Sequence, residues 1–411
     1  MSTTHAAAPP LPDDAPVAAP ARYDSLDVLR GLAVLMIFAV NVRHMLLPFW
    51  AQADPTLWGG PHDLRIDLAL QFLVDGKWIA VFAVLFGAGL ALLAEKAEAA
   101  GTAPRDRIVR RQLWLIGFGV AHMAFVWLGD VLVTYGVTGL VAMTLLGRSS
   151  RTVAAWAAAS LTLSVAMLWA LGLVMALVPP EEVAGTGFSF PELIAAEREA
   201  KSGGIGAQLA WRAEAAALML PNSVTALPFV LSYMLVGVLA YRSGFLLARW
   251  PVGRYLAVGL PGLGAAWAID WWRTGAIGVW SGADVDYQVA VARYLWIGVV
   301  EGLSGGLGYA ALVMAMVRAG VRPRPLAAAG RMAFTNYVAC SVIGTTLAAG
   351  HGAGLLGRVT LAEAMVVVAA TWLAILVVSP LWLSVFRYGP LEWLWRSLSY
   401  GRLQPMLRGR V

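Results

Sequence analysis

Apolar residues along this chain gather in long runs that are separated by short polar segments. A helix needs about 20 apolar residues to cross a bilayer, and about ten runs approach that length. The pattern therefore predicts an all-α fold, a polytopic bundle of transmembrane helices. The runs lie at roughly 29–49, 77–94, 112–128, 131–147, 153–178, 223–241, 255–271, 291–317, 332–349 and 361–386.

Lys and Arg concentrate in alternate connections between these runs, and with ten spans those connections share one side. Basic residues mark the cytoplasmic side of a membrane protein, so both termini are predicted to be cytoplasmic. The opposite side is richer in acidic residues, among them Asp54, Asp63, Glu181, Glu182, Glu192, Asp284 and Asp286.

Composition agrees with a membrane protein. The chain has 411 residues, of which 59% are hydrophobic and 13% are charged, against about 25% charged in an average soluble domain. The net charge of +6 comes from basic connections, so nucleic-acid binding is not needed to explain it. Cys340 is the single cysteine, which excludes an internal disulfide and a Cys-rich zinc site. No metal site is predicted.

Three regions follow from this division. Residues 1–21 are rich in Ala and Pro and are predicted to form a disordered tail. Residues 22–386 form the transmembrane helical domain, with longer external segments at 50–76 and 179–222, the second of which contains a short polar helix in FPELIAAEREAKSGG. Residues 387–411 mix aromatic and basic side chains, as is typical of a cytoplasmic interfacial helix and tail.

The leading candidate for chemistry is His122, which lies inside an apolar run and is followed by a Gly-Asp turn at Asp130. Ionisable groups are costly in a membrane, and imidazole moves protons near neutral pH. A core histidine bonded to a neighbouring helix is the alternative. Eight residues of helix rise about 12 Å, so a direct bond between the two is not expected. Asp130 is expected either to cap the next helix or to serve in proton relay, substrate binding or the orientation of another group.

Other polar residues are candidates for a substrate-binding set. Tyr135 follows Asp130 by about 7–8 Å of helical rise and could line the same pocket. Glu301 lies among glycines in the 291–317 run, where a carboxylate either bonds a neighbouring helix or lines a polar cavity. His44, near the outer end of the first run, and Asn336 complete the set. Asp75 and Lys77 are expected to pair with each other.

The first helix begins with RYDSLDVLRG. Ser25 or Asp24 can cap it, and Asp27 lies near its positive end. Arg22 and Arg30 either pair with Asp27 or bind the phosphates of a cytoplasmic ligand. No P-loop, HExxH, GxSxG or Rossmann fingerprint occurs in a suitable context, so nucleotide hydrolysis, metalloprotease and serine hydrolase chemistry have no support in the motifs.

Five stretches of sequence resemble the YeiB family of bacterial membrane proteins, a domain of unknown function, over nearly the whole chain after the tail. The third and the last are the most specific. The stretches are LDVLRGLAVLMIFAVN (26–41), GKW…LFGAG (76–89), GVAHMAFVWLGDVLVTYG (119–136), GRMAFTNYVACS (330–341) and FRYGPLEWLWRSLSYGRLQP (386–405).

This family resembles a branch of the transmembrane acyltransferase superfamily, which contains the heparan glucosaminide N-acetyltransferase. Its opening motif is matched by the residues Arg22, Ser25, Asp27, Arg30 and Gly31. The resemblance implies an essential histidine, for which His122 is the best match, and a chain in the bacterial inner membrane. It also implies transfer of an acyl group from cytoplasmic acyl-CoA to an acceptor on the far side.

Two classes of function therefore stay open. In the first, acyl-CoA is a co-substrate rather than a tightly bound cofactor, His122 and Asp130 are catalytic, and Arg22, Ser25, Asp27 and Arg30 bind the donor. The acceptor is an envelope glycan or a lipid-linked molecule. In the second, the chain transports a small polar solute or lipid, or is a non-catalytic membrane partner. Membrane lipid is a partner in each case, nucleic acid is not, and the oligomeric state is open.

Overall fold

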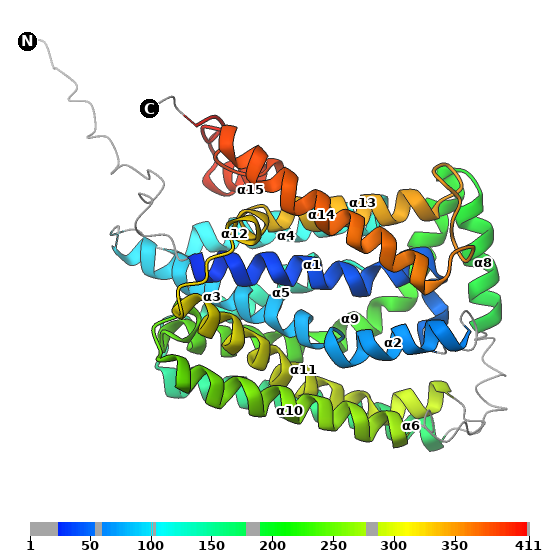
Figure 1. The fold of residues 1–411 in the computed structure, drawn as a ribbon, viewed down its shortest axis with the longest axis horizontal. Coiled ribbons are helices and arrows are strands. Elements are labelled where there is room, and N and C mark those ends of the chain that lie inside the picture. The colour runs from blue at the N-terminus through cyan, green and yellow to red at the C-terminus, as the bar shows by residue number, and fades with distance from the viewer. Residues whose placement is uncertain are drawn as a thin grey trace, which may run out of the picture.

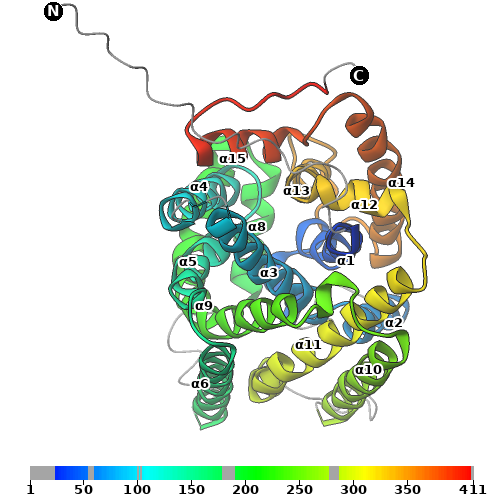
Figure 2. The same cartoon turned by 90° about the vertical axis from the view of Figure 1, so that its left-hand side faces the viewer.

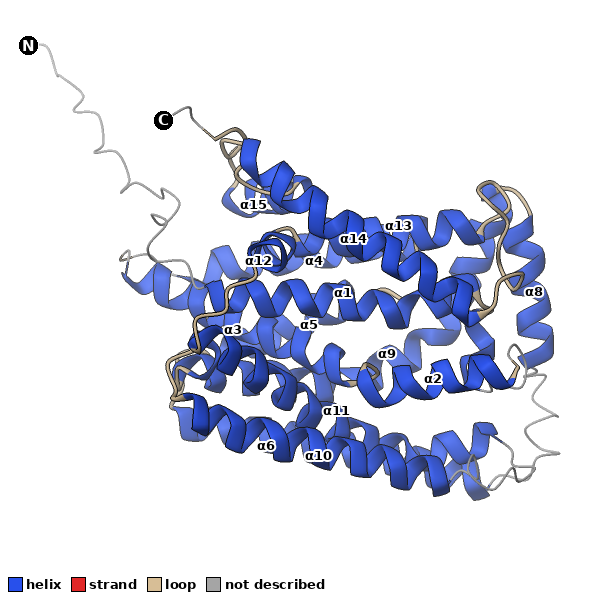
Figure 3. Cartoon of the chain, viewed as in Figure 1, coloured by secondary structure: helices blue, strands red, loops and turns tan. Residues whose placement is uncertain are grey.

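The computed structural model of the chain describes residues 24–53, 60–99, 101, 104–177, 190–276 and 287–408. Within these residues the regular elements are helices (Figure 3), apart from a single antiparallel β-bridge between Phe386 and Leu407. Most helices run along the long axis of one bundle (Figure 1). The predicted all-α fold is confirmed.

Each predicted apolar run coincides with a helix. In chain order these helices are α1 (Asp24–Leu46), α3 (Lys77–Ala99), α4 (Pro104–Phe125), α5 (Leu132–Ala142), α6 (Ser150–Leu177), α9 (Ile205–Arg242), α10 (Val252–Ala276), α11 (Tyr287–Arg318), α13 (Ala333–Ala348) and α14 (Leu361–Val385).

The described residues contain seven helical segments that are long and apolar enough to cross a membrane, or up to eight if one bent pair forms a single span. That pair is α12 (Arg324–Arg331) and α13, which meet at 83°. The short apolar helix Leu132–Leu145, made of α5 and η4 (Met143–Leu145), falls outside this count. The protein is a polytopic membrane protein, and ten spans stays a prediction.

The remaining elements are short. The predicted polar helix in the 179–222 segment is confirmed as α8. Part of the 50–76 segment is helical and enters the candidate span His62–Ala99. These elements are η2 (Phe49–Ala53), α2 (Pro61–Leu73), α8 (Phe190–Ser202), η5 (Phe245–Leu247) and α15 (Pro390–Tyr400).

Helix α1 lies at the centre of the bundle, surrounded by other helices (Figure 2). The apolar side chains of α1 are buried on most sides of the helix. Helix α14, by contrast, exposes Val366, Leu373 and Leu381 on one side. Exposed apolar side chains on a peripheral helix suit contact with lipid tails. The start of α1, α12 and α15 share one end of the bundle, and α8 lies at the other (Figure 1). We refer to these as the α15 end and the α8 end.

Small residues let some helices approach closely, as the 43 glycines in the sequence suggested. A Cβ added at Gly87 of α3 would lie 1.8 Å from the carbonyl oxygen of Met234 in α9. Reciprocally, a Cβ at Gly237 would lie 1.9 Å from the carbonyl oxygen of Val84. Backbone therefore packs directly on backbone where α3 crosses α9.

Candidate functional site

His122 and Asp130 form a buried pair. The His122 Nδ1 atom lies 3.0 Å from Asp130 Oδ1, and the two side chains are 2% and 1% exposed. The expectation that helical rise keeps them apart was wrong, because α4 ends at Phe125. The N–H groups of Val126 and Trp127 both bond to the carbonyl oxygen of His122, and this turn brings Asp130 back beside the imidazole.

The Asp130 carboxylate also holds the start of α5. Its Oδ2 atom accepts the backbone N–H of Val133 at 2.9 Å, which leaves Oδ1 for the histidine. A Cβ at Gly119 of α4 would lie 2.8 Å from Oδ2 and 2.6 Å from the Val133 nitrogen, so the close approach of α4 depends on glycine there. Asp130 therefore accepts a hydrogen bond at the start of α5, as expected for a cap, and contacts His122 at the same time, which was not expected.

This arrangement defines what the imidazole can do. A carboxylate at Nδ1 favours the tautomer with a proton on that nitrogen, which leaves the lone pair on Nε2. His122 Nε2 is buried and has no hydrogen-bond partner among the described residues. The rings of Tyr337 and Trp127 lie 5.2 and 6.4 Å from the imidazole. A buried imidazole that is oriented by a carboxylate and free at Nε2 is the arrangement of a general base.

The predicted substrate-binding residues do not gather around His122. The Tyr135 hydroxyl donates to the carbonyl oxygen of Ile79 at 3.2 Å and so ties α5 to α3. Asn336 donates from Nδ2 to Ala329 O at 3.0 Å and to Ser379 Oγ at 3.1 Å, which joins α13 to α12 and α14.

Of that set, His44 lies near the α8 end, where its ring is 6.4 Å from that of Phe49. Its Nδ1 atom is buried and has no partner in the described part of the chain. Phe49 lines a pocket at this end of the bundle. His44 is not among the residues that line this pocket.

The predicted donor-binding residues have structural contacts at the α15 end. The buried Ser25 hydroxyl donates to Leu246 O at 2.9 Å. Arg30 Nη1 lies 2.9 Å from Asp27 Oδ1, which matches the ion-pair alternative. Arg22 lies outside the described residues.

Gly31, the last residue of the matched opening motif, has a packing role. A Cβ at Gly31 would lie 2.0 Å from the carbonyl oxygen of Leu326 in α12. In the same way, a Cβ at Gly330 of α12 would lie 1.8 Å from the carbonyl oxygen of Asp27. The glycine thus allows α1 and α12 to cross in backbone contact.

Glu301 belongs to a second buried polar site, which sequence reasoning missed. The Lys77 Nζ atom is fully buried and lies 2.8 Å from Asp270 Oδ2, and it also pairs with Glu301. Arg273 Nη2 lies 2.8 Å from Asp270 Oδ1. These four residues, which we call the Lys77 cluster, join α3, α10 and α11 with balanced formal charge. The expected side-chain pair between Asp75 and Lys77 is absent. The Lys77 ammonium donates to the backbone oxygen of Asp75 and does not pair with its carboxylate.

The Lys77 cluster adjoins a break in a long helix. Helices α2 and α3 form one candidate span of 38 residues, interrupted at Val74–Gly76. Gly76 has φ +69°, which favours glycine. Beside the break, Arg43 of α1 pairs with Asp67 and Asp75. The sequence signals for this site are Glu301 inside an apolar run and the positions of Lys77 and Asp270 at the edges of apolar runs.

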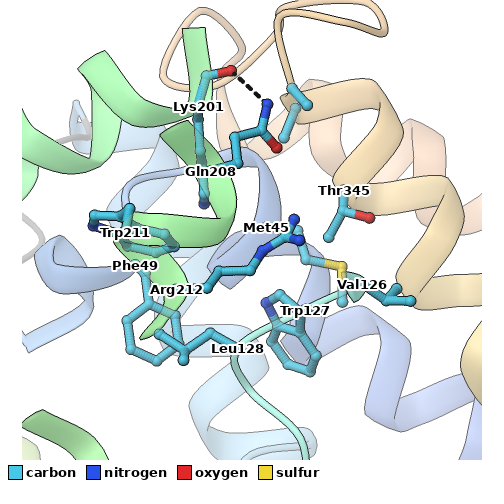
Figure 4. Close-up of a pocket in the computed structure, with 12 residues that line it drawn as sticks. Met45, Phe49, Val126, Trp127, Leu128, Lys201, Gln208, Trp211, Arg212 and Thr345 are labelled. Carbon is cyan, nitrogen blue, oxygen red and sulfur yellow. Dashed lines mark hydrogen bonds between the residues drawn. The ribbon is translucent and has the colours of Figure 1, made fainter. Parts of the chain in front are cut away.

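A small pocket lies at the α8 end beside the turn that follows His122 (Figure 4). Val126, Trp127 and Leu128 of that turn form one wall. In Figure 4 the Arg212 side chain of α9 points towards Met45 and Trp127. In the described residues no three or more His, Cys, Asp or Glu side chains gather in a way that would hold a metal ion.

The fold and these buried sites define a polytopic, all-helical membrane protein with ionisable side chains in its interior. Residues 240–402 of the chain match a family that is described as a protein of unknown function, DUF418. This match covers the region from the end of α9 to α15.

Similarity to individual proteins extends over nearly the whole chain. The chain is 29% identical to the uncharacterized protein YeiB of Escherichia coli K12, over 94% of this chain and 98% of that protein. It is also 29% identical to the uncharacterized protein YxaH of Bacillus subtilis 168, over 94% of this chain and 96% of the relative. These relatives and the DUF418 match support the resemblance to YeiB-like proteins.

Proposed function

We propose that the protein is a membrane-bound acyltransferase of the bacterial inner membrane that moves an acyl group from cytoplasmic acyl-CoA to an extracytoplasmic envelope acceptor. The observation that carries the proposal is the His122–Asp130 pair, with its free Nε2 atom. Nε2 takes the proton from an acceptor hydroxyl or amine as the acceptor attacks the acyl carbonyl carbon. Asp130 stabilises the resulting imidazolium. The C–S bond of the thioester then breaks, and the imidazolium gives its proton to the sulfur, so that CoA leaves as the thiol.

The α15 end offers support for an anionic donor. The Arg111 guanidinium stacks on Trp395, with its carbon 3.4 Å from the ring centroid. The guanidinium carbons of Arg107 and Arg396 both lie against the Tyr400 ring, 4.6 and 5.1 Å from its centroid. Clustered guanidinium groups favour phosphate oxygens, which acyl-CoA carries.

The test is acyl transfer from labelled acetyl-CoA to an envelope glycan fraction, measured with purified protein in proteoliposomes. His122→Ala should lose at least about 100-fold in rate, the range expected for a general base. His62→Ala, an exposed histidine in α2, is the matched control and should keep full activity. Full activity in the His122→Ala variant would remove this residue from the mechanism.

A second candidate function is transport of a small polar solute coupled to protons. The broken α2–α3 span beside the Lys77 cluster favours it, because interrupted helices and buried charges mark solute pathways in membranes. Transport predicts solute flux into liposomes with no acyl donor, and loss of that flux in Asp270→Asn. Acyl transfer by the purified protein with no flux would exclude this candidate.

A further inference from the structure

The pocket at the α8 end presents hydrogen-bond donors that have no acceptor. Trp127 is 5% exposed, lines the pocket, and its indole N–H has no partner among the described residues. Arg212 lines the same pocket and forms no ion pair within the part of the chain that the structure describes. A buried donor without an acceptor is unfavourable, as is a positive charge without a partner, so these groups suit an anionic ligand that accepts hydrogen bonds.

Among the described residues, the Arg212 guanidinium donates a single hydrogen bond. Its Nη1 atom donates to the carbonyl oxygen of Ala124 in the last turn of α4 at 3.2 Å, and a guanidinium has five N–H donors. Burial lowers the pKa of Arg212, which means that its environment penalises the positive charge. A bound anion would offset that penalty.

Other polar groups of the pocket are already bonded within the protein. Gln208 Nε2 lies 3.1 Å from His351 Nδ1, and the Thr345 hydroxyl donates to Ser341 O at 2.7 Å. Lys201 Nζ is neutralised by the buried Glu197 at 2.6 Å. The uncompensated positive charge therefore belongs to Arg212. A second pocket shares Arg212, Gln208, Thr345 and Val126, so Arg212 lines both pockets.

The rest of the wall is apolar. Met45, Phe49, Leu128 and Trp211 line the pocket (Figure 4). A simple inorganic anion would leave this apolar surface uncovered. A ligand with a charged head and an apolar part matches both halves of the lining.

We infer that this pocket is the binding site for the phosphate group of an amphiphilic acceptor, with Arg212 and the Trp127 indole N–H holding the phosphate oxygens. The inference rests on the proposed acyltransferase function, because it names the class of acceptor. The Trp127 ring lies 6.4 Å from the His122 imidazole, so a phosphate held at Trp127 places the acceptor beside the base.

The test is isothermal titration calorimetry on the full chain in a non-ionic detergent. The probes are dihexanoyl phosphatidylglycerol, sn-glycerol 3-phosphate and neutral dihexanoylglycerol. The phosphatidylglycerol should bind tightest, since it carries both the phosphate and the apolar part. Tightest binding by glycerol 3-phosphate would instead identify a free phosphate ester as the ligand and overturn the amphiphile assignment.

Variants assign the contacts. Arg212→Gln should weaken phosphatidylglycerol binding about tenfold, as for loss of a charge-assisted hydrogen bond, and leave dihexanoylglycerol unchanged. Trp127→Phe keeps the ring, removes the N–H, and should give a smaller loss. Arg198→Gln, an exposed arginine of α8 outside the pocket, is the matched control.

An NMR measurement separates contact from folding. In protein labelled with ¹⁵N-tryptophan, the indole signal missing from Trp127→Phe belongs to Trp127, and it should shift when phosphatidylglycerol is added. Equal affinities of Arg212→Gln and Arg198→Gln, or an unmoved Trp127 signal, would overturn the site. Selective phosphatidylglycerol binding without acyl transfer would instead reject the proposed function and leave the site standing. Acyl transfer without phosphatidylglycerol binding would reject the proposed phosphate site and leave the proposed function standing.

Discussion

The Lys77 cluster makes the sharpest prediction about stability. Lys77 and Arg273 balance Asp270 and Glu301, so the four formal charges sum to zero. Lys77→Met leaves one excess negative charge in a buried place, and removing one partner of a buried pair costs about 3–5 kcal/mol. Because Arg273 still pairs with Asp270, the uncompensated carboxylate is that of Glu301.

A second substitution should therefore repair the first. Glu301→Gln alone leaves one excess positive charge and should also destabilise the protein. The double variant Lys77→Met with Glu301→Gln restores neutrality and should recover most of the stability that Lys77→Met loses. Coupling between contacting charges of about 0.5–3 kcal/mol is expected from such a cycle.

The assay is the unfolding midpoint of each variant in the same detergent, compared with that of Lys96→Met, which changes an exposed lysine of α3. If Lys77→Met yields no folded protein, recovery of folded protein in the double variant tests the same point. A double variant no more stable than Lys77→Met would refute the charge-balance reasoning, and so would a Lys77→Met variant as stable as the unmodified protein.

The remaining predictions concern packing, capping and the candidate base. Gly87→Ala should cost about 1–3 kcal/mol in unfolding measurements, because its Cβ would lie 1.8 Å from a carbonyl oxygen of α9, whereas Gly89→Ala, with nothing within 4 Å, should not destabilise. Glu392 of α15 accepts the N–H and the hydroxyl of Thr335 at the start of α13, so Glu392→Ala should lower the unfolding midpoint and Glu392→Gln should do so less. Burial raises the pKa of Glu392, so the folded protein binds a proton at this residue more tightly than the unfolded chain does. The free energy of unfolding should therefore fall as pH rises through that pKa. The unfolding midpoint of Glu392→Gln should not show this pH dependence. Asp130→Asn should reduce acyl transfer at saturating substrate by about 100-fold with little change in donor affinity, and unchanged turnover would contradict the role of the pair.

The sequence alone predicted the class of fold because the bilayer imposes a length and a composition on each spanning segment. All the predicted apolar runs appear as helices, and the polar segment FPELIAAEREAKSGG contains α8. Periodicity and hydropathy are local properties, so they can be read without knowing which helices touch.

Contacts between helices were beyond such reasoning. The prediction that His122 and Asp130 lie apart assumed a regular helix between them. A turn of a few residues at the end of α4 instead brings the two side chains into contact. Asp270 and Glu301 come from the consecutive helices α10 and α11, but Lys77 of α3 precedes Asp270 by 193 residues, and no spacing in the sequence indicates that they meet.

For this protein, then, the sequence determined the membrane class, the positions of the helices and the candidate histidine, because hydrophobic length and the cost of a buried charge act within one segment. Only the tertiary structure decided which charge neutralises which, where the α2–α3 span breaks, and which donors face the pocket at Arg212. Those outcomes depend on side chains from separate helices meeting in a low-dielectric interior, where each unpaired charge or donor must find a partner.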